Sequence, residues 1–302
     1  MGQPYGPGSP GFGILGAGVL AALLLWCALA VWLASHHGVL VAAMDRLRAT
    51  ARYDRLHAWA TEHLGGPVTA LARWLSVDVA AALGLVSGMV LVALLSAGFT
   101  KLLDDVLDGE LTFYVDQPAS QWLAARRDLW LTATLKVLTH LGDTASLVVI
   151  VAVVCAPVCW RARSWLPALL GLFGLAGVGL VLVVAKVMVG RTRPPSWIAV
   201  IVEDGFSFPS GHATGAFGVA ILVAWMLGRW VVRGWAARVS LWATAFAAAG
   251  LIAFSRVYLG VHYVSDVVAG AFLGAAWAVA VIVVGAWWET RRRSALPAPP
   301  TA

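Results

Sequence analysis

Long apolar runs alternate with short polar segments along most of this chain. A helix needs about 20 predominantly apolar residues to cross the hydrocarbon core of a membrane. We expect membrane spans at 14–34, 80–99, 146–160, 166–189, 212–230, 241–258 and 264–288. The pattern therefore predicts an all-α, polytopic membrane helix bundle with seven spans.

The segment between the first two predicted spans, residues 35–77, has a different pattern. Leu40, Met44 and Leu47 fall on one helical face, whereas the arginines of this segment fall on the other faces. A basic helix of this kind lies flat on a membrane surface. We expect residues 65–67, Gly-Gly-Pro, to break the helix and a shorter amphipathic piece to follow.

A second interfacial helix is predicted for residues 122–141, before the third span. Leu131, Leu135 and Leu138 share one face of it, as expected for a helix that packs on one side. His140 lies near its end, and we interpret it as a capping or packing residue.

The composition agrees with a membrane protein. Hydrophobic residues make up 61% of the chain and charged residues 12%, whereas a soluble domain is about 25% charged. The net charge of +6 comes from basic residues beside the spans and in the motifs described below, so it does not indicate nucleic-acid binding. The three cysteines lie inside apolar runs and predict neither a disulfide framework nor a metal site.

The distribution of arginines predicts the orientation. With the N-terminus outside, the inner segments hold thirteen arginines, and the outer segments hold four basic residues once those of the motif stretches are set aside. Because Lys and Arg are enriched in inner loops, this orientation is favoured.

The stretch from Ser255 to Asp266 carries the strongest chemical signal. It holds Arg256, His262 and Asp266 between two apolar runs, and ionisable groups at membrane depth are functional candidates. On a helix, Asp266 lies one turn after His262. A carboxylate there fixes the imidazole tautomer and leaves the other ring nitrogen free as a base or nucleophile.

Two upstream stretches complete a set of motifs. Lys186 precedes Arg193-Pro194 by the spacing Lys-x6-Arg-Pro, and Ser210, Gly211 and His212 belong to a Pro-Ser-Gly-His turn. Fixed cations around two histidines suggest a dianionic ligand, for which phosphate is the natural choice. Two histidines and one aspartate beside three cations make a poor metal site, so we expect no metal and no cofactor.

These motifs resemble those of the type 2 phosphatidic acid phosphatase family of membrane lipid phosphatases. With Ser-Arg-x5-His-x3-Asp at 255–266, every motif position agrees, and the resemblance covers roughly residues 99–288. It implies a six-span phosphatase core at 78–290. One extra span and the amphipathic segment precede it at 1–77, and a basic, Pro/Ala-rich tail follows at 291–302.

The resemblance also implies a role for each motif residue. His262 would be the nucleophile, Asp266 would hold its far nitrogen, and His212 would be the general acid and base. The residues expected to bind phosphate are Lys186, Arg193, Ser210, Gly211 and Arg256. Each residue type suits its role, because phosphoryl transfer needs charge neutralisation and proton transfer.

The expected function is hydrolysis of a lipid phosphate at the outer face of a bacterial plasma membrane. Undecaprenyl diphosphate is slightly preferred as substrate, and phosphatidylglycerol phosphate and phosphatidic acid are alternatives. A lipid phosphotransferase using the same histidine is a further alternative. Seven predicted spans argue against the related soluble haloperoxidases, and intact motifs argue against a degenerate, non-enzymatic binding protein. The expected partners are the lipid substrate and membrane lipids, and the oligomeric state stays open.

Overall fold

The computed structural model describes residues 13–75 and 77–294, and every regular element in these residues is helical. Predictions for the leading residues 1–12 and for the last residues, 295–302, lie outside the described part. The helices are α1 Ile14–Ser35, α2 His37–Arg48, α3 Ala51–Leu75, α4 Val79–Leu107, η1 Thr112–Asp116, α5 Gln117–Ala125, α6 Leu129–Thr139, η2 His140–Gly142, α7 Thr144–Ala162, α8 Leu166–Val189, α9 Gly211–Trp230, α10 Trp235–Tyr258 and α11 Val264–Ser294.

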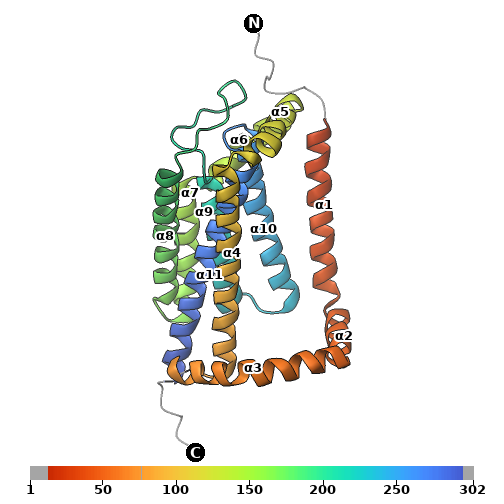
Figure 1. The fold of residues 1–302 in the computed structure, drawn as a ribbon, viewed down its shortest axis with the longest axis vertical. Helices are drawn as coiled ribbons and strands as arrows, with labels where there is room; N and C mark the ends of the chain where they lie inside the picture. Colours follow the sequence, from red (N-terminus) through yellow and green to blue (C-terminus); the bar gives the residue numbers. More distant parts are fainter. Residues whose placement is uncertain (1–12, 76, 295–302) are drawn as a thin grey trace, which may run out of the picture.

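Seven of these helices are long and apolar enough to cross a membrane, which confirms the predicted membrane helix bundle. They are α1, α4, α7, α8, α9, α10 and α11. Figure 1 shows them running roughly alongside one another, with α5 and α6 at one end and α3 across the other. Helix α9 is the most buried span, and it packs against α7, α8, α10 and α11.

Small residues allow α9 and α11 to approach closely. Gly270 and Gly274 are one turn apart on α11, and a Cβ atom added at Gly274 would lie 2.1 Å from the carbonyl oxygen of Thr214 on α9. Such spacing of small residues is typical of tight helix pairs in membranes. The crossing brings the first turns of α9 and α11 together, because Ser210 N–H also donates to the carbonyl of Asp266 at 2.9 Å.

The amphipathic segment is helical, but its predicted break is in the wrong place. Helix α3 continues through Pro67, and the interruption lies instead at residues 49–50, between α2 and α3. The hydroxyl of Thr50 accepts a bond from Tyr53 N–H at 3.3 Å, which caps a new helix start. Within α3, the hydroxyl of Thr69 donates to the carbonyls of Gly65 and Gly66 at 2.9 Å, which helps to satisfy the backbone around the proline.

The helix predicted for 122–141 is also interrupted. It forms α5, α6 and η2, with a turn at residues 126–128. Arg127 donates to the carbonyl of Tyr258 at 2.9 Å, and Asp128 N–H donates to the Tyr258 hydroxyl at 2.8 Å. These bonds to α10 hold the turn. The predicted apolar face is confirmed, because Leu131 and Leu135 are buried.

Helix α1 is attached to the rest of the bundle along α10. Its first turn has no capping side chain of its own, and Gly16 N–H donates instead to Asp128 Oδ2 at 2.9 Å. Further along, Trp26 Nε1 donates to the carbonyl of Ala243 at 2.9 Å, and Trp235 Nε1 donates to the carbonyl of Leu33 at 2.7 Å.

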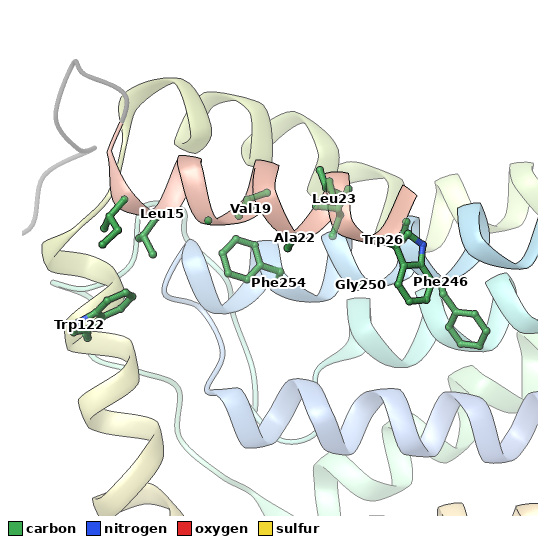
Figure 2. Close-up of a pocket in the computed structure, with 13 residues that line it drawn as sticks. Leu15, Val19, Ala22, Leu23, Trp26, Trp122, Phe246, Gly250 and Phe254 are labelled. Carbon is green, nitrogen blue, oxygen red and sulfur yellow. The ribbon is translucent and has the colours of Figure 1, made fainter. Parts of the chain in front are cut away.

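Between these attachment points lies an apolar groove of about 530 Å³, with Trp122 at one end (Figure 2). Phe246, Gly250 and Phe254 form its α10 wall. Arg256 is two residues beyond Phe254, and residues two apart point to nearly opposite sides of a helix. Phe254 in the groove wall therefore points away from the side of α10 that carries Arg256.

Candidate functional site

The motif residues meet at one end of the bundle. Lys186 lies in the last turn of α8, Arg256 in the last turn of α10 and Asp266 in the first turn of α11. Ser210 immediately precedes α9. Because neighbouring spans run in opposite directions, these helix ends lie together at one end of the bundle. In Figure 1 this is the end that holds the loop after α8.

His262 is buried between a carboxylate and a guanidinium. Its Nδ1 lies 3.4 Å from Asp266 Oδ2, and its Nε2 lies 3.1 Å from Arg193 Nη1. Since a guanidinium only donates, Nε2 must be the acceptor, and this assigns the ring proton to Nδ1, on the Asp266 side. Burial lowers the pKa of His262 to about 4, although the Asp266 carboxylate opposes the shift. The imidazole is therefore neutral near pH 7, with the lone pair of Nε2 on the Arg193 side.

Asp266 is fixed by several donors. Its Oδ2 accepts bonds from the Ser207 hydroxyl at 2.5 Å and from Tyr263 N–H at 2.8 Å. Its Oδ1 accepts a bond from Arg191 Nη1 at 2.6 Å. The side chain of Asp266 is fully buried, so these bonds replace water and fix the carboxylate facing His262.

Arg191 and Asp116 form a second layer that the sequence reading did not identify. Arg191 Nη2 donates to Asp116 Oδ2 at 2.7 Å and to the Thr112 hydroxyl at 2.6 Å, while Nη1 also donates to Ser265 at 2.7 Å. Arg191 lies inside the Lys-x6-Arg-Pro spacing, where it was a visible charged residue. Asp116 belongs to η1, which is far from every motif along the sequence. No sequence signal therefore connects it to the site.

His212 lies in the first turn of α9 and is bonded to a carboxylate that the sequence reading also missed. Its Nε2 lies 2.9 Å from Asp143 Oδ1, and the other Asp143 oxygen lies 2.9 Å from His140 Nδ1. His140 occupies the C-cap position of α6, so it is a capping residue as predicted, and it also contacts Asp143. Burial would raise the pKa of Asp143, but the two histidines outweigh it and keep that pKa below its usual value.

The three predicted phosphate-binding cations all face acceptors of one loop segment, residues 203–206. Lys186 Nζ donates to the carbonyl of Phe206 at 2.7 Å. Arg193 donates to the carbonyls of Gly205 at 3.0 Å and Asp204 at 2.9 Å. Arg256 donates to the Glu203 carboxylate, and its other terminal nitrogen donates to Thr139 at 2.8 Å.

The Pro-Ser-Gly-His turn supplies the neutral donors. The Ser210 hydroxyl is buried and has no hydrogen-bond partner among the described residues. Helix α9 begins at Gly211, and the first N–H groups of a helix favour anions. Across residues 13–75 and 77–294 no cluster of three or more His, Cys, Asp or Glu side chains is placed to hold a metal ion. The arrangement therefore offers anion donors around a neutral imidazole.

Comparison with known proteins points to one family. The sequence profile of the PAP2 superfamily matches residues 167–290. Phosphatidylglycerophosphatase B of Bacillus subtilis is 31% identical over 159 residues, which cover 53% of this chain and 77% of that protein. Decaprenylphosphoryl-5-phosphoribose phosphatase of Mycobacterium tuberculosis is 35% identical over 166 residues, covering 53% of this chain and 84% of that protein.

A solved structure shares the fold. The transmembrane PAP2-type phosphatidylglycerolphosphate phosphatase of Bacillus subtilis superposes with a TM-score of 0.60 at 28% sequence identity. The match covers 63% of this chain and 94% of the other.

Proposed function

The chain belongs to the PAP2 superfamily and is a membrane lipid phosphatase of that type, and we propose that it cleaves lipid phosphates through a phosphohistidine on His262. The observation that carries the proposal is the assigned tautomer of His262. Nε2 has its lone pair beside Arg193 at 3.1 Å, and Asp266 faces the opposite nitrogen at 3.4 Å. A neutral imidazole in this tautomer has an unprotonated Nε2, which is the form that a nucleophile requires.

In the first step, His262 Nε2 attacks phosphorus and the bond between phosphorus and the lipid oxygen breaks. His212 donates a proton to that oxygen, so a phosphomonoester releases its lipid alcohol and a lipid diphosphate releases the lipid monophosphate. Asp143 holds Nε2 of His212, which leaves Nδ1 as the nitrogen that exchanges protons. Asp266 stabilises the positive charge that develops on His262.

In the second step, His212 takes a proton from water and the water oxygen attacks phosphorus. The bond between phosphorus and His262 breaks, and inorganic phosphate leaves. Lys186, Arg193 and Arg256 neutralise the non-bridging oxygens, while the Ser210 hydroxyl and the Gly211 amide add donors. In this mechanism the fixed cations provide the charge neutralisation.

We place the site at the outer membrane face, in the bacterial plasma membrane. The basis is the excess of arginines in the segments at the opposite end of the bundle. Helix α3, which lies across that end in Figure 1, carries Arg52, Arg55 and Arg73.

Among lipid phosphates, we propose phosphatidylglycerol phosphate as the first candidate. Similarity to phosphatidylglycerophosphatase B across 77% of its length supports it. Undecaprenyl diphosphate, preferred from the sequence alone, is the second candidate, because outer-face access suits a carrier lipid and a relative acts on a decaprenylphosphoryl lipid by name. The ratio of kcat/KM for the two lipids in matched micelles decides between them.

The mechanism is tested with His262→Ala. Wild-type protein treated with labelled substrate and quenched should carry an acid-labile, base-stable phosphoryl group, and His262→Ala should lose both this group and turnover. His57→Ala is the matched control, because His57 is an exposed histidine on α3. Wild-type turnover in His262→Ala would refute the mechanism. Phosphate release in the absence of an acceptor alcohol distinguishes a hydrolase from a phosphotransferase.

A further inference from the structure

We propose that Asp143 is a positioning residue that keeps His212 in its proton-donating form, and that the enzyme depends on it far more for lipid phosphomonoesters than for lipid diphosphates. The inference rests on the proposed function of the same site and deepens it. It concerns a carboxylate that belongs to none of the three motifs, and it names the class of substrate for which that carboxylate is required.

Asp143 occupies a helix N-cap position without capping the helix. It has an extended backbone and directly precedes α7, where an aspartate normally accepts a bond from an N–H group of the first turn. Its side chain makes no such bond. Asp78 holds the same position ahead of α4 and shows the ordinary arrangement, because its Oδ1 accepts a bond from Ala81 N–H at 2.6 Å. The carboxylate of Asp143 is therefore available to other donors.

Both oxygens of Asp143 face histidines instead. Oδ1 lies 2.9 Å from His212 Nε2, and Oδ2 lies 2.9 Å from His140 Nδ1. The turn that carries Asp143 packs closely on His212, because a Cβ atom added at Gly142 would lie 2.8 Å from Cδ2 of that ring. Only 15% of the His212 side chain is exposed, so water contributes little to stabilising a positive charge on it. Asp143 is placed to provide that stabilisation.

A general acid must carry its proton when the substrate arrives. For His212 this requires a proton on each ring nitrogen, one directed at Asp143 and one left for the leaving oxygen. The cations that bind phosphate disfavour this second positive charge, whereas a neighbouring carboxylate favours it. Removing the charge of Asp143 should therefore reduce the fraction of His212 that can donate a proton, while the phosphate-binding groups stay in place.

The leaving group decides how much that fraction matters. A phosphomonoester releases an alcohol, and an alkoxide is too basic to leave readily without a proton. A lipid diphosphate releases a lipid monophosphate, whose oxygen is stable as an anion because the second pKa of a phosphate monoester is about 6. General acid catalysis is worth about 10²–10⁴-fold in rate, and the monoester gains most from it.

The test measures kcat/KM of Asp143→Asn for phosphatidic acid and for undecaprenyl diphosphate in matched micelles. This constant ends at release of the leaving group, so it excludes the later hydrolysis of the phosphohistidine, which both substrates share. Asparagine keeps the shape of the side chain and removes its charge. Because 43% of the Asp143 side chain is exposed, water screens part of that charge. We therefore expect a loss of about tenfold for phosphatidic acid, below the full general-acid contribution, and of less than about twofold for the diphosphate.

Two further variants separate charge from structure. Asp143→Glu retains the charge and should recover part of the loss for phosphatidic acid. Asp78→Asn is the matched control, because it removes the charge of an N-cap carboxylate that bonds to a backbone N–H, and it should leave both constants unchanged. Melting curves show whether each variant is folded. A purely structural role of Asp143 would lower both constants by the same factor.

Equal losses for the two lipids, or no loss for phosphatidic acid, in folded Asp143→Asn overturn the inference. Hydrolysis of the diphosphate alone by the wild type also overturns it. If the wild type acts on monoesters alone, 4-nitrophenyl phosphate, whose phenolate leaves readily, replaces the diphosphate, and the same unequal loss is expected. A wild-type protein that hydrolyses no lipid phosphate would instead refute the proposed function, and the inference with it.

Discussion

Replacing Arg191 with methionine should destabilise the protein and slow turnover without removing any residue that contacts the substrate. The guanidinium of Arg191 lies between Asp116 and Asp266, at 2.7 Å and 2.6 Å, and both carboxylates have no exposed side-chain surface. Methionine fills similar space but leaves two buried carboxylates without their shared cation.

The size of the effect follows from this burial. Removing one partner of a buried ion pair destabilises a protein by about 3–5 kcal/mol, which is a large part of a typical total stability of about 5–15 kcal/mol. Asp266 would also lose the donor that fixes Oδ1. Because a displacement of about 1 Å in a reacting group lowers the rate by roughly a hundredfold, kcat should fall by about that factor.

The assay combines thermal unfolding in micelles with steady-state kinetics. Arg191→Lys should lie between wild type and Arg191→Met, since an ammonium retains charge but lacks the geometry to reach all four side-chain partners. Asp116→Asn should partly restore the stability of Arg191→Met, with a coupling of about 0.5–3 kcal/mol. If Arg191→Met unfolds and turns over like wild type, or if the two substitutions are additive, the bridging role is wrong.

Two further predictions concern pH and the attachment of α1. The pKa of His262 is lowered from 6.5 to about 4, so the unfolded state binds the proton more readily between these values. Wild type should therefore lose stability relative to His262→Gln as pH falls from 6.5 to 4. Equal changes in the melting temperatures of the two proteins over this range would contradict the prediction. Gly16→Ala should lower the melting temperature, because an added Cβ would lie 2.3 Å from Trp130. Gly18→Ala is the control and should leave the melting temperature unchanged, because an added Cβ there would have no atom within 4 Å. Equal effects of the two substitutions would exclude tight packing at Gly16.

The spans and motifs were predictable because their signals are local. Apolar length alone located the seven spans, and the spacing of the motifs singled out Lys186, Arg193, Arg256 and Asp266. The helix interruptions were not predictable in the same way. The turn at residues 126–128 depends on bonds from Arg127 and Asp128 to Tyr258, which is distant in sequence.

The missed site residues share one physical property. Asp116, Asp143 and Glu203 each lie outside the motifs and reach the site only when the helix ends come together. A lone carboxylate in a segment between spans is indistinguishable, by sequence, from a solvated surface residue. The division of the chain at residue 77, by contrast, remains a prediction.

The odd number of candidate spans in residues 13–75 and 77–294 has a practical consequence for measuring sidedness. Helix α1 begins at the end of the bundle that holds the motif residues, and α11 ends at the other (Figure 1). A reporter fused after α11 therefore samples the compartment away from the motif residues, whereas an epitope placed ahead of α1 samples the compartment that the proposed site faces. Impermeant reagents applied to intact cells bearing each fusion would show which side of the membrane the motif residues face, without any enzyme assay.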